Sequence, residues 1–219
     1  MATRNKGEGN GRAGLSGLDA SFLYLETPEQ PMHVSSLCIY EIPDALKRNF
    51  PKAVTEHLKK RLHLAPIFTN VLAYAPYGLG HPHWEHADDL DFDYHVRVIE
   101  LPKPGTMRQL EAAVAKAHAE LMDRSRPLWR LYVLEGLASG EQAYYFKVHH
   151  AMLDGQAGVA LASAMFGTSP DPLPATRPPR SKPVAPPPGT LALAAAAFRH
   201  DAAQYVKLVR ELPGVVALT

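Results

Sequence analysis

Two stretches of the chain repeat apolar residues at helical spacing. Val54, Leu58 and Leu62 recur every four residues, which predicts a helix over about residues 50–64 with one apolar face. A second helix is expected after Thr106, a residue type that favours helix N-caps. The inner face of this second helix is predicted to hold Leu110, Val114, Ala117 and Leu121.

Shorter apolar runs predict strands. Residues 129–135 and 142–149 read as two strands joined by a turn at 136–141, because apolar side chains alternate along the second and glycines punctuate the turn. Residues 32–42, rich in apolar and small side chains, are expected to form a buried strand. Further candidates are strands at 68–74, around Trp84 and at 94–101, and a short helix from Ser16 to Leu25. The mixed order favours the α/β class, a mixed sheet flanked by helices.

Charge and composition limit the kinds of binding partner and the cellular location that can be expected. The chain has 23 Lys and Arg against 22 Asp and Glu, a net charge of +1, which argues against nucleic acid as the main partner. Cys38 is the single cysteine and lies in an apolar run, so a buried structural thiol and a cytoplasmic location are expected. Residues 1–14 are polar and rich in glycine, which predicts a disordered tail and no signal peptide. No apolar stretch is long enough to predict a transmembrane helix.

The C-terminal third changes character. Nine of the 20 prolines fall within residues 169–190, which therefore read as an extended, semi-rigid linker. Residues 191–219 are rich in alanine and are expected to be helical, packing on a further part of the protein. The predicted domain is thus residues 15–168, followed by this linker and helix.

Candidate chemistry lies where the strand 142–149 ends. His149 and His150 are followed by Asp154 and Gly155, and the two rings are expected to point to opposite sides. An imidazole titrates near neutrality, so it can take a proton from a hydroxyl and return it. Asp154 could orient such a ring, and Gly155 would permit a tight turn into a helix over 156–165. The alternative is structural, since paired histidines and an Asp-Gly turn also occur without function.

The run 149–155 resembles the HHxxxDG signature of the CoA-dependent acyltransferase superfamily. Further stretches resemble the wax ester synthase/diacylglycerol acyltransferase family within it, and they are residues 15–22 with 32–34, 84–96 and 126–129. The resemblance implies a fold similar to chloramphenicol acetyltransferase and to condensation domains. Members of the superfamily have two related halves with the active site between them. A chain of 219 residues is therefore expected to supply the N-terminal half and to need a C-terminal half.

The resemblance also implies a reaction. A fatty acyl group would pass from acyl-CoA to diacylglycerol or a long-chain alcohol, making triacylglycerol or wax ester, with His150 as the general base. His149 would support the loop, and Asp154 would orient the base, held by Arg124, Arg126 or Arg130. Acyl-CoA would be a substrate, and no cofactor is implied. The chain would work in the cytoplasm, at the surface of a membrane or lipid droplet.

Two other functions remain open. One is acyl transfer from a carrier-protein thioester, as in condensation or polyketide-associated enzymes. The other is a non-catalytic half-domain that binds lipid or protein.

The remaining motifs indicate structural roles and no additional catalytic or metal site. Pro127, Leu128 and Trp129 are expected to be structural elements near the site, with the Trp129 ring buried beneath it. No metal site is expected, because the cluster of His81, His83, Glu85 and His86 lies in a loop rich in glycine and proline and lacks a second ligand group at typical zinc spacing. The chain also lacks the Gly-x-Ser-x-Gly elbow of serine hydrolases and a phosphate-binding P-loop.

Overall fold

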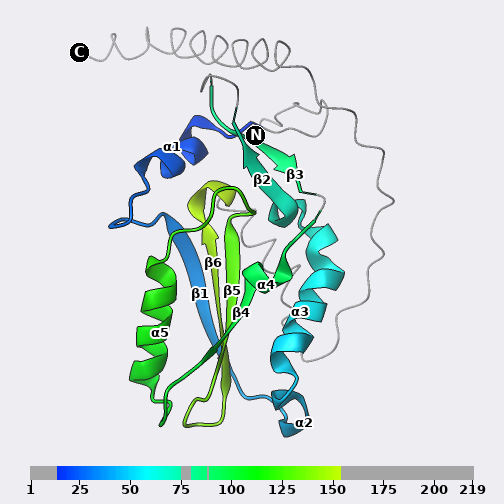
Figure 1. Cartoon of the computed structure of the whole chain (residues 1–219), viewed down its shortest axis with the longest axis vertical. Coiled ribbons are helices and arrows are strands. Elements are labelled where there is room, and N and C mark those ends of the chain that lie inside the picture. The colour runs from blue at the N-terminus through cyan, green and yellow to red at the C-terminus, as the bar shows by residue number, and fades with distance from the viewer. Residues whose placement is uncertain (1–13, 75–79, 88, 154–219) are drawn as a thin grey trace, which may run out of the picture.

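A computed structural model describes residues 14–74, 80–87 and 89–153 (Figure 1). The described part is built on a four-stranded sheet whose strands are ordered β1-β6-β5-β4. The strands are β1 His33–Tyr40, β4 Val96–Glu100, β5 Trp129–Glu135 and β6 Gln142–His149. β6 runs antiparallel to both β1 and β5, whereas β4 runs parallel to β5. The mixed sheet predicted from the sequence is therefore confirmed.

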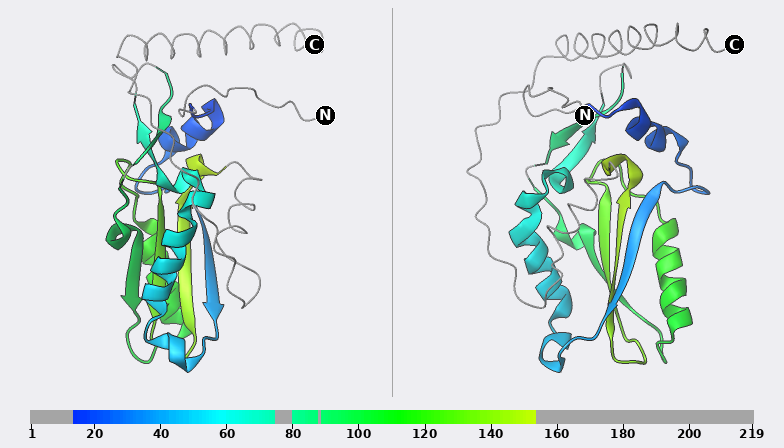
Figure 2. Two further views of the ribbon diagram at one scale, coloured as in Figure 1. Left: turned by 90° about the vertical axis from the view of Figure 1, so that its right-hand side faces the viewer. Right: turned by 180° about the vertical axis from the view of Figure 1, so that it is seen from behind.

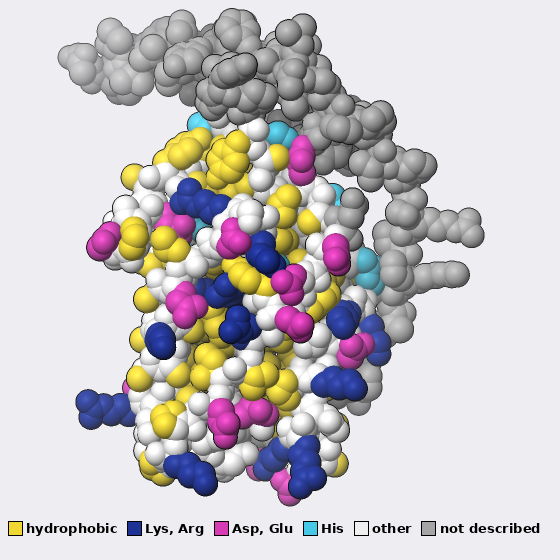
Figure 3. Space-filling model, in the orientation of Figure 1, with side chains coloured by type: hydrophobic (Ala, Val, Ile, Leu, Met, Phe, Trp, Pro, Cys, Tyr) yellow, Lys and Arg dark blue, Asp and Glu magenta, His cyan; other side chains and the backbone are white. Residues whose placement is uncertain are grey.

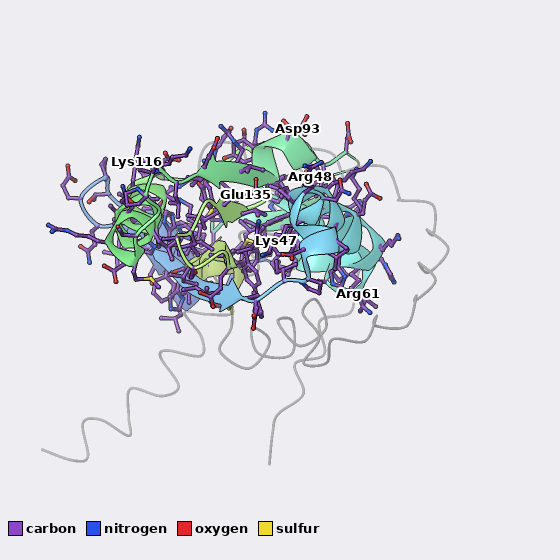
Figure 4. All side chains as sticks on the ribbon, turned by 90° about the horizontal axis from the view of Figure 1, so that it is seen from below. Lys47, Arg48, Arg61, Asp93, Lys116 and Glu135 are labelled. Carbon is purple, nitrogen blue, oxygen red and sulfur yellow. The ribbon has the colours of Figure 1, made fainter. Side chains whose placement is uncertain are left out.

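Helices lie on both faces of this sheet. α3 (Phe50–Arg61) packs on one face and α5 (Met107–Ala119) on the other, as the views in Figure 2 show. Figure 4 places Lys116 of α5 and Arg61 of α3 on opposite sides of Glu135, at the end of β5. Thr106 caps α5 through a capping box with Gln109, which satisfies backbone N–H groups that the first turn leaves free.

The alternation of side chains along β5 divides the core in two. Trp129, Leu131 and Val133 face the α3 side, while Tyr132 and Leu134 face the α5 side. Each set joins apolar residues of the helix that covers it, such as Leu58 and Leu62 on one side and Leu110 and Ala117 on the other. Burial of both faces is the expected state of the central strand of a layered α/β domain.

Smaller elements frame one end of the sheet. β2 (Asn70–Ala73) and β3 (His83–His86) form a separate hairpin pair. α1 (Gly17–Leu25) begins at Ser16, whose hydroxyl accepts a hydrogen bond from the Asp19 N–H. The remaining elements are the short helices α2 Asp44–Lys47 and α4 Phe92–His95 and the 3-10 turns η1 Leu62–Leu64, η2 Pro66–Thr69 and η4 His150–Met152.

Several expectations are corrected. β1 is an edge strand with its central residues exposed, so it is not the buried strand expected at 32–42, and Cys38 is only partly buried. Strand β4 begins at Val96, because the Asp91 carboxylate accepts the Tyr94 N–H and holds the preceding residues in a helical turn. Leu121 lies beyond the end of α5 and is exposed, so it does not belong to the inner face of that helix.

Some expectations concern residues outside the described ranges. These are the tail 1–13 and the segments 156–165, 169–190 and 191–219, so the domain boundaries drawn there stay predictions. Within the described ranges, no helix has the length and hydropathy needed to cross a bilayer.

Candidate active site

The paired histidines sit where β6 ends. His149 is the last residue of β6, and His150 begins the 3-10 turn η4. Both lie beside α1, which contacts η4 at the same end of the sheet. Asp154 and Gly155 lie outside the described residues, so their predicted roles are not addressed by this geometry.

The His149 ring is fully buried, and both of its nitrogens face protein atoms. Nδ1 accepts a hydrogen bond from the Ala151 N–H at 3.1 Å, so the neutral ring carries its proton on Nε2. Nε2 lies 3.4 Å from Oε1 of Glu26, within ion-pair distance but without the alignment of a hydrogen bond. Burial lowers the pKa of His149 to about 4, although the Glu26 charge acts in the opposite direction. The ring is therefore neutral at pH 7.

Glu26 supplies the carboxylate that lies next to His149, His33 and Arg124. It is the C-cap residue of α1, and its side chain is only 2 % exposed. Oε1 accepts the Met32 N–H at 3.1 Å and lies 3.3 Å from Nε2 of His33, while Oε2 accepts from Arg124 at 3.1 Å. Burial acts to raise the pKa of Glu26, but the hydrogen bonds from the Met32 N–H and from the Arg124 guanidinium hold it below its usual value. Glu26 is therefore a buried carboxylate with charged and hydrogen-bonding partners.

His33 brings a second imidazole to the same carboxylate. It pairs with His149 in the register of β1 and β6, so both rings reach Glu26 from neighbouring strands. Its Nδ1–H donates to the carbonyl oxygen of His118, 3.1 Å away. Burial and the charge of Lys147 lower the pKa of His33, whereas the hydrogen bond to the His118 carbonyl and the charge of Glu26 act to raise it.

His150 differs from both buried rings. It is half-buried, and its ring stacks on Phe22 of α1 with a centroid separation of 3.8 Å. Its backbone N–H donates to the Met32 carbonyl at 2.8 Å, which anchors the main chain. Among the described residues, none hydrogen-bonds a ring nitrogen of His150, and its Nδ1 is buried. With respect to the described residues, this imidazole thus keeps acceptor capacity that the His149 ring has already used.

A buried lysine supports the strand from the α5 side. Lys147 is fully buried, and its Nζ donates to the carbonyl oxygens of Ala117 at 2.6 Å and Glu120 at 2.5 Å. Burial lowers its pKa to about 8. The ammonium satisfies carbonyl groups that the end of α5 leaves without helical partners, so it ties that helix to β6.

The stretch Pro127-Leu128-Trp129 lies beside the end of β6, where β5 begins. The Leu128 carbonyl accepts the His149 N–H at 2.9 Å, and the Leu128 side chain is fully buried. Trp129 is 1 % exposed, as the sequence predicted, and its indole N–H donates to the Phe68 carbonyl at 2.8 Å. These contacts fix the end of β6 through backbone and ring packing.

The three arginines proposed as anchors for Asp154 bind other groups. Their carboxylate partners among the described residues are Glu26 for Arg124, Asp91 and Asp123 for Arg126, and Glu120 for Arg130. Arg126 and Arg130 also stack on the Tyr94 ring. Nothing in this geometry reserves any of them for Asp154.

The histidines near β3 do not converge on one point. Their polar contacts are Tyr24 for His81, Glu85 for His83 and Thr69 for His86. In the part of the chain that the structure describes, no three potential ligands come together as a metal site.

Glu26 and His33 are the site residues that sequence reasoning missed. His33 was part of a stretch that carried the family resemblance, but neither residue was given a role. Their importance depends on the pairing of β1 with β6 and on the position of α1, which no local pattern in the sequence reports. The sequence did offer one signal for this pair: Glu26 lies between a predicted short helix and a predicted strand, and His33 stands near the start of that strand.

Comparisons with known proteins agree on one family. The family model described as "Wax ester synthase/diacylglycerol acyltransferase catalytic domain" matches residues 15–219. A probable diacylglycerol O-acyltransferase of Mycobacterium tuberculosis is 39% identical over 172 residues, which are 74% of this chain and 38% of that protein. The O-acyltransferase WSD of Acinetobacter baylyi is 38% identical over 152 residues, 67% of this chain and 31% of that one. The chain thus spans less than half the length of these relatives.

Solved structures give the same result. The wax ester synthase/diacylglycerol acyltransferase from Marinobacter aquaeolei VT8 superposes with a TM-score of 0.61 at 34% identity, covering 75% of this chain and 41% of that one. The starter condensation domain of rhizomide synthetase superposes with a TM-score of 0.53 at 15% identity, covering 70% and 37%. The second likeness shows a shared fold. The expected relation to condensation domains is therefore confirmed at the level of architecture.

Proposed function

The chain belongs to the wax ester synthase/diacylglycerol acyltransferase catalytic-domain family, and from that premise we propose that it takes part in fatty acyl transfer from acyl-CoA to diacylglycerol or a long-chain alcohol. The observation that carries the proposal is the state of the two adjacent imidazoles. His149 is fully buried and its Nδ1 is used by the Ala151 N–H, whereas His150 is half-buried and has no ring hydrogen bond to a described residue. His150 is thus the ring that can accept a proton from a substrate.

The proposed reaction proceeds in a single displacement at the thioester carbonyl. His150 takes the proton of the acceptor hydroxyl while the oxygen attacks that carbonyl carbon, and a new C–O bond forms. The tetrahedral species then breaks its C–S bond, and the departing thiolate of CoA takes the proton back from His150. Nothing in this scheme calls for a cofactor or for an acyl group carried on the enzyme. Asp154 and Gly155 keep their predicted roles in orienting the base and shaping the turn.

Exposed apolar side chains on α1 support this choice of substrates. Three apolar side chains of α1 are strongly exposed, namely Leu18, Tyr24 and Leu25. Figure 3 shows hydrophobic side chains gathered on the surface around α1. Since Phe22 of the same helix stacks on His150, these side chains would bring an apolar surface close to the base. We therefore place the proposed reaction at the surface of a membrane or lipid droplet, on its cytoplasmic side.

The test compares His150→Ala with a matched control, His86→Ala, which removes an exposed histidine on β3. Release of CoA thiol from acyl-CoA is followed with diacylglycerol or a fatty alcohol as acceptor, and the products are identified by mass spectrometry. The chain is assayed alone and together with the unmatched part of the Marinobacter enzyme, supplied as a separate polypeptide. A parallel reaction with an acyl carrier protein tests the other donor.

We expect His150→Ala to lose at least about 100-fold in rate, in the range of a general base, while a cooperative melting transition shows that the variant still folds. His86→Ala should retain the activity of the unaltered chain. An active His150→Ala protein would refute the proposed base. Activity with the carrier protein alone would replace acyl-CoA as the donor, and no turnover in any arm would favour a non-catalytic half-domain.

A further inference from the structure

Glu26 is connected to the main chain on both sides of His150. On one side, Oε1 accepts the Met32 N–H, and the Met32 carbonyl in turn accepts the His150 N–H. On the other side, Nε2 of His149 faces the same Oε1, and Nδ1 of that ring accepts the Ala151 N–H. Two consecutive backbone amides, those of residues 150 and 151, therefore depend on one carboxylate through one intermediate group each.

The carboxylate itself is held rigidly. Arg124 donates both to Oε2 of Glu26 and to the Leu23 carbonyl, at 3.1 Å and 2.6 Å, which ties the carboxylate to the last turn of α1. The Glu26 N–H donates to the carbonyl of Phe22, the residue whose ring stacks on His150. The end of α1 thus sets the position of the His150 ring by stacking and that of its backbone by hydrogen bonds.

The tautomer of His149 explains why a negatively charged side chain is needed at position 26. Since Nδ1 of His149 must accept the Ala151 N–H, its proton sits on Nε2, and a carboxylate is the partner that favours this tautomer. An amide in place of the carboxylate can turn its NH2 group toward Nε2. That orientation favours the opposite tautomer, in which Nδ1 carries the proton and repels the Ala151 N–H.

We propose that Glu26 is a positioning residue, which fixes the turn carrying His150 through Met32 on one side and through the tautomer of His149 on the other. The catalytic part of this inference rests on the proposed function, in which His150 is the base. Glu26 itself has no contact with the acyl donor or acceptor in this scheme.

The test uses Glu26→Gln, Glu26→Asp and a control, Glu29→Gln, which alters an exposed acidic residue of the following turn. Hydrogen exchange of the amides of residues 150 and 151 and the nitrogen chemical shifts of the His149 ring are measured on the whole chain by NMR. Melting temperatures are recorded for each protein. Acyl transfer is then compared as kcat and KM in the assay described above.

For Glu26→Gln we expect exchange at both amides to be at least about 10-fold faster, and the His149 ring to shift toward its Nδ1–H tautomer. A misplaced base should lower kcat by roughly 10- to 100-fold while KM for acyl-CoA stays within about twofold. Glu26→Asp, one methylene shorter, should show the same changes to a smaller extent. Glu29→Gln should match the unaltered chain in every measurement.

Unchanged exchange at both amides in either Glu26 variant would overturn the proposal, and if Glu26→Gln does not fold, Glu26→Asp decides alone. Faster exchange beside an unchanged kcat would also overturn it, because the turn would then move without consequence for the base. If the unaltered chain transfers no acyl group in any arm, the proposed function fails. The exchange and tautomer measurements then still report whether Glu26 holds the turn.

Discussion

His95 offers a quantitative test of the packing beneath the site. Its ring is 1 % exposed and stacks on Trp129 at 4.4 Å, and its Nδ1–H donates to the Trp129 carbonyl at 2.9 Å. Burial lowers the pKa of His95 from 6.5 to about 4; Arg126 acts in the same direction, whereas the bond to Trp129 and the charge of Asp91 oppose it. The perturbation is His95→Phe, which keeps a flat ring and removes the titration.

Acid lowers the free energy of unfolding through His95, because the unfolded chain binds the proton at a higher pH than the folded chain. Between pH 6.5 and pH 4 the unfolded chain protonates this imidazole and the folded chain does not, so acid favours unfolding. The shift from 6.5 to about 4 makes the folded protein lose about 2 kcal/mol through His95 between pH 7 and pH 5. Above pH 7 this contribution is nearly constant, because the ring is neutral in both states.

Urea denaturation followed by circular dichroism at pH 7 and pH 5 measures the free energy of unfolding of both proteins. The variant also loses the hydrogen bond to the Trp129 carbonyl, but that cost is the same at both pH values and cancels in the comparison. The unaltered chain should lose about 2 kcal/mol more than His95→Phe between the two pH values. An equal loss in the two proteins would show that His95 is not a buried neutral ring.

Two further predictions concern stability. Trp129→Ala should cost about 3–5 kcal/mol of unfolding free energy in urea denaturation, because it empties a buried site and leaves the Phe68 carbonyl without its donor; a loss below about 1 kcal/mol would contradict this. Gly105→Ala should lower the melting temperature more than Gly140→Ala. Both glycines have positive φ, 78° and 79°, which costs an L-residue about 1–2 kcal/mol, but only at Gly105 would the new Cβ meet backbone, 1.8 Å from the Gly136 carbonyl oxygen. Equal melting temperatures would contradict the steric argument.

The sequence predicted best where one local pattern decides the structure. Strands β5 and β6 and their turn agree with the expected bounds, because side-chain alternation and glycine at the turn act over neighbouring residues. The start of α5 followed from Thr106 for the same reason. The exposure of β1 was not predictable, since it depends on which strand has no second neighbour in the sheet formed by the described residues.

The candidate site also contains residues that could be located from the sequence and residues that could not. His149 and His150 could be located from the heptapeptide, and the burial of Trp129 from its residue type. The convergence of Glu26 and His33 on His149 could not, because it arises from pairing between segments at opposite ends of the described chain. The partners of the three arginines likewise depend on how the ends of α1, α4 and α5 come to lie near them.

The residue-for-residue match of His33 with His149 has a practical consequence for anyone who edits this protein. If a single amino acid inserted or deleted in the short connection ahead of β1 shifted that strand by one residue, its two faces would be exchanged. His33 would then turn away from the Glu26 carboxylate although no side chain had been substituted. Tolerance to changes in loop length should therefore be far lower there than at the tip of the β5–β6 hairpin, which lies at the other end of these strands.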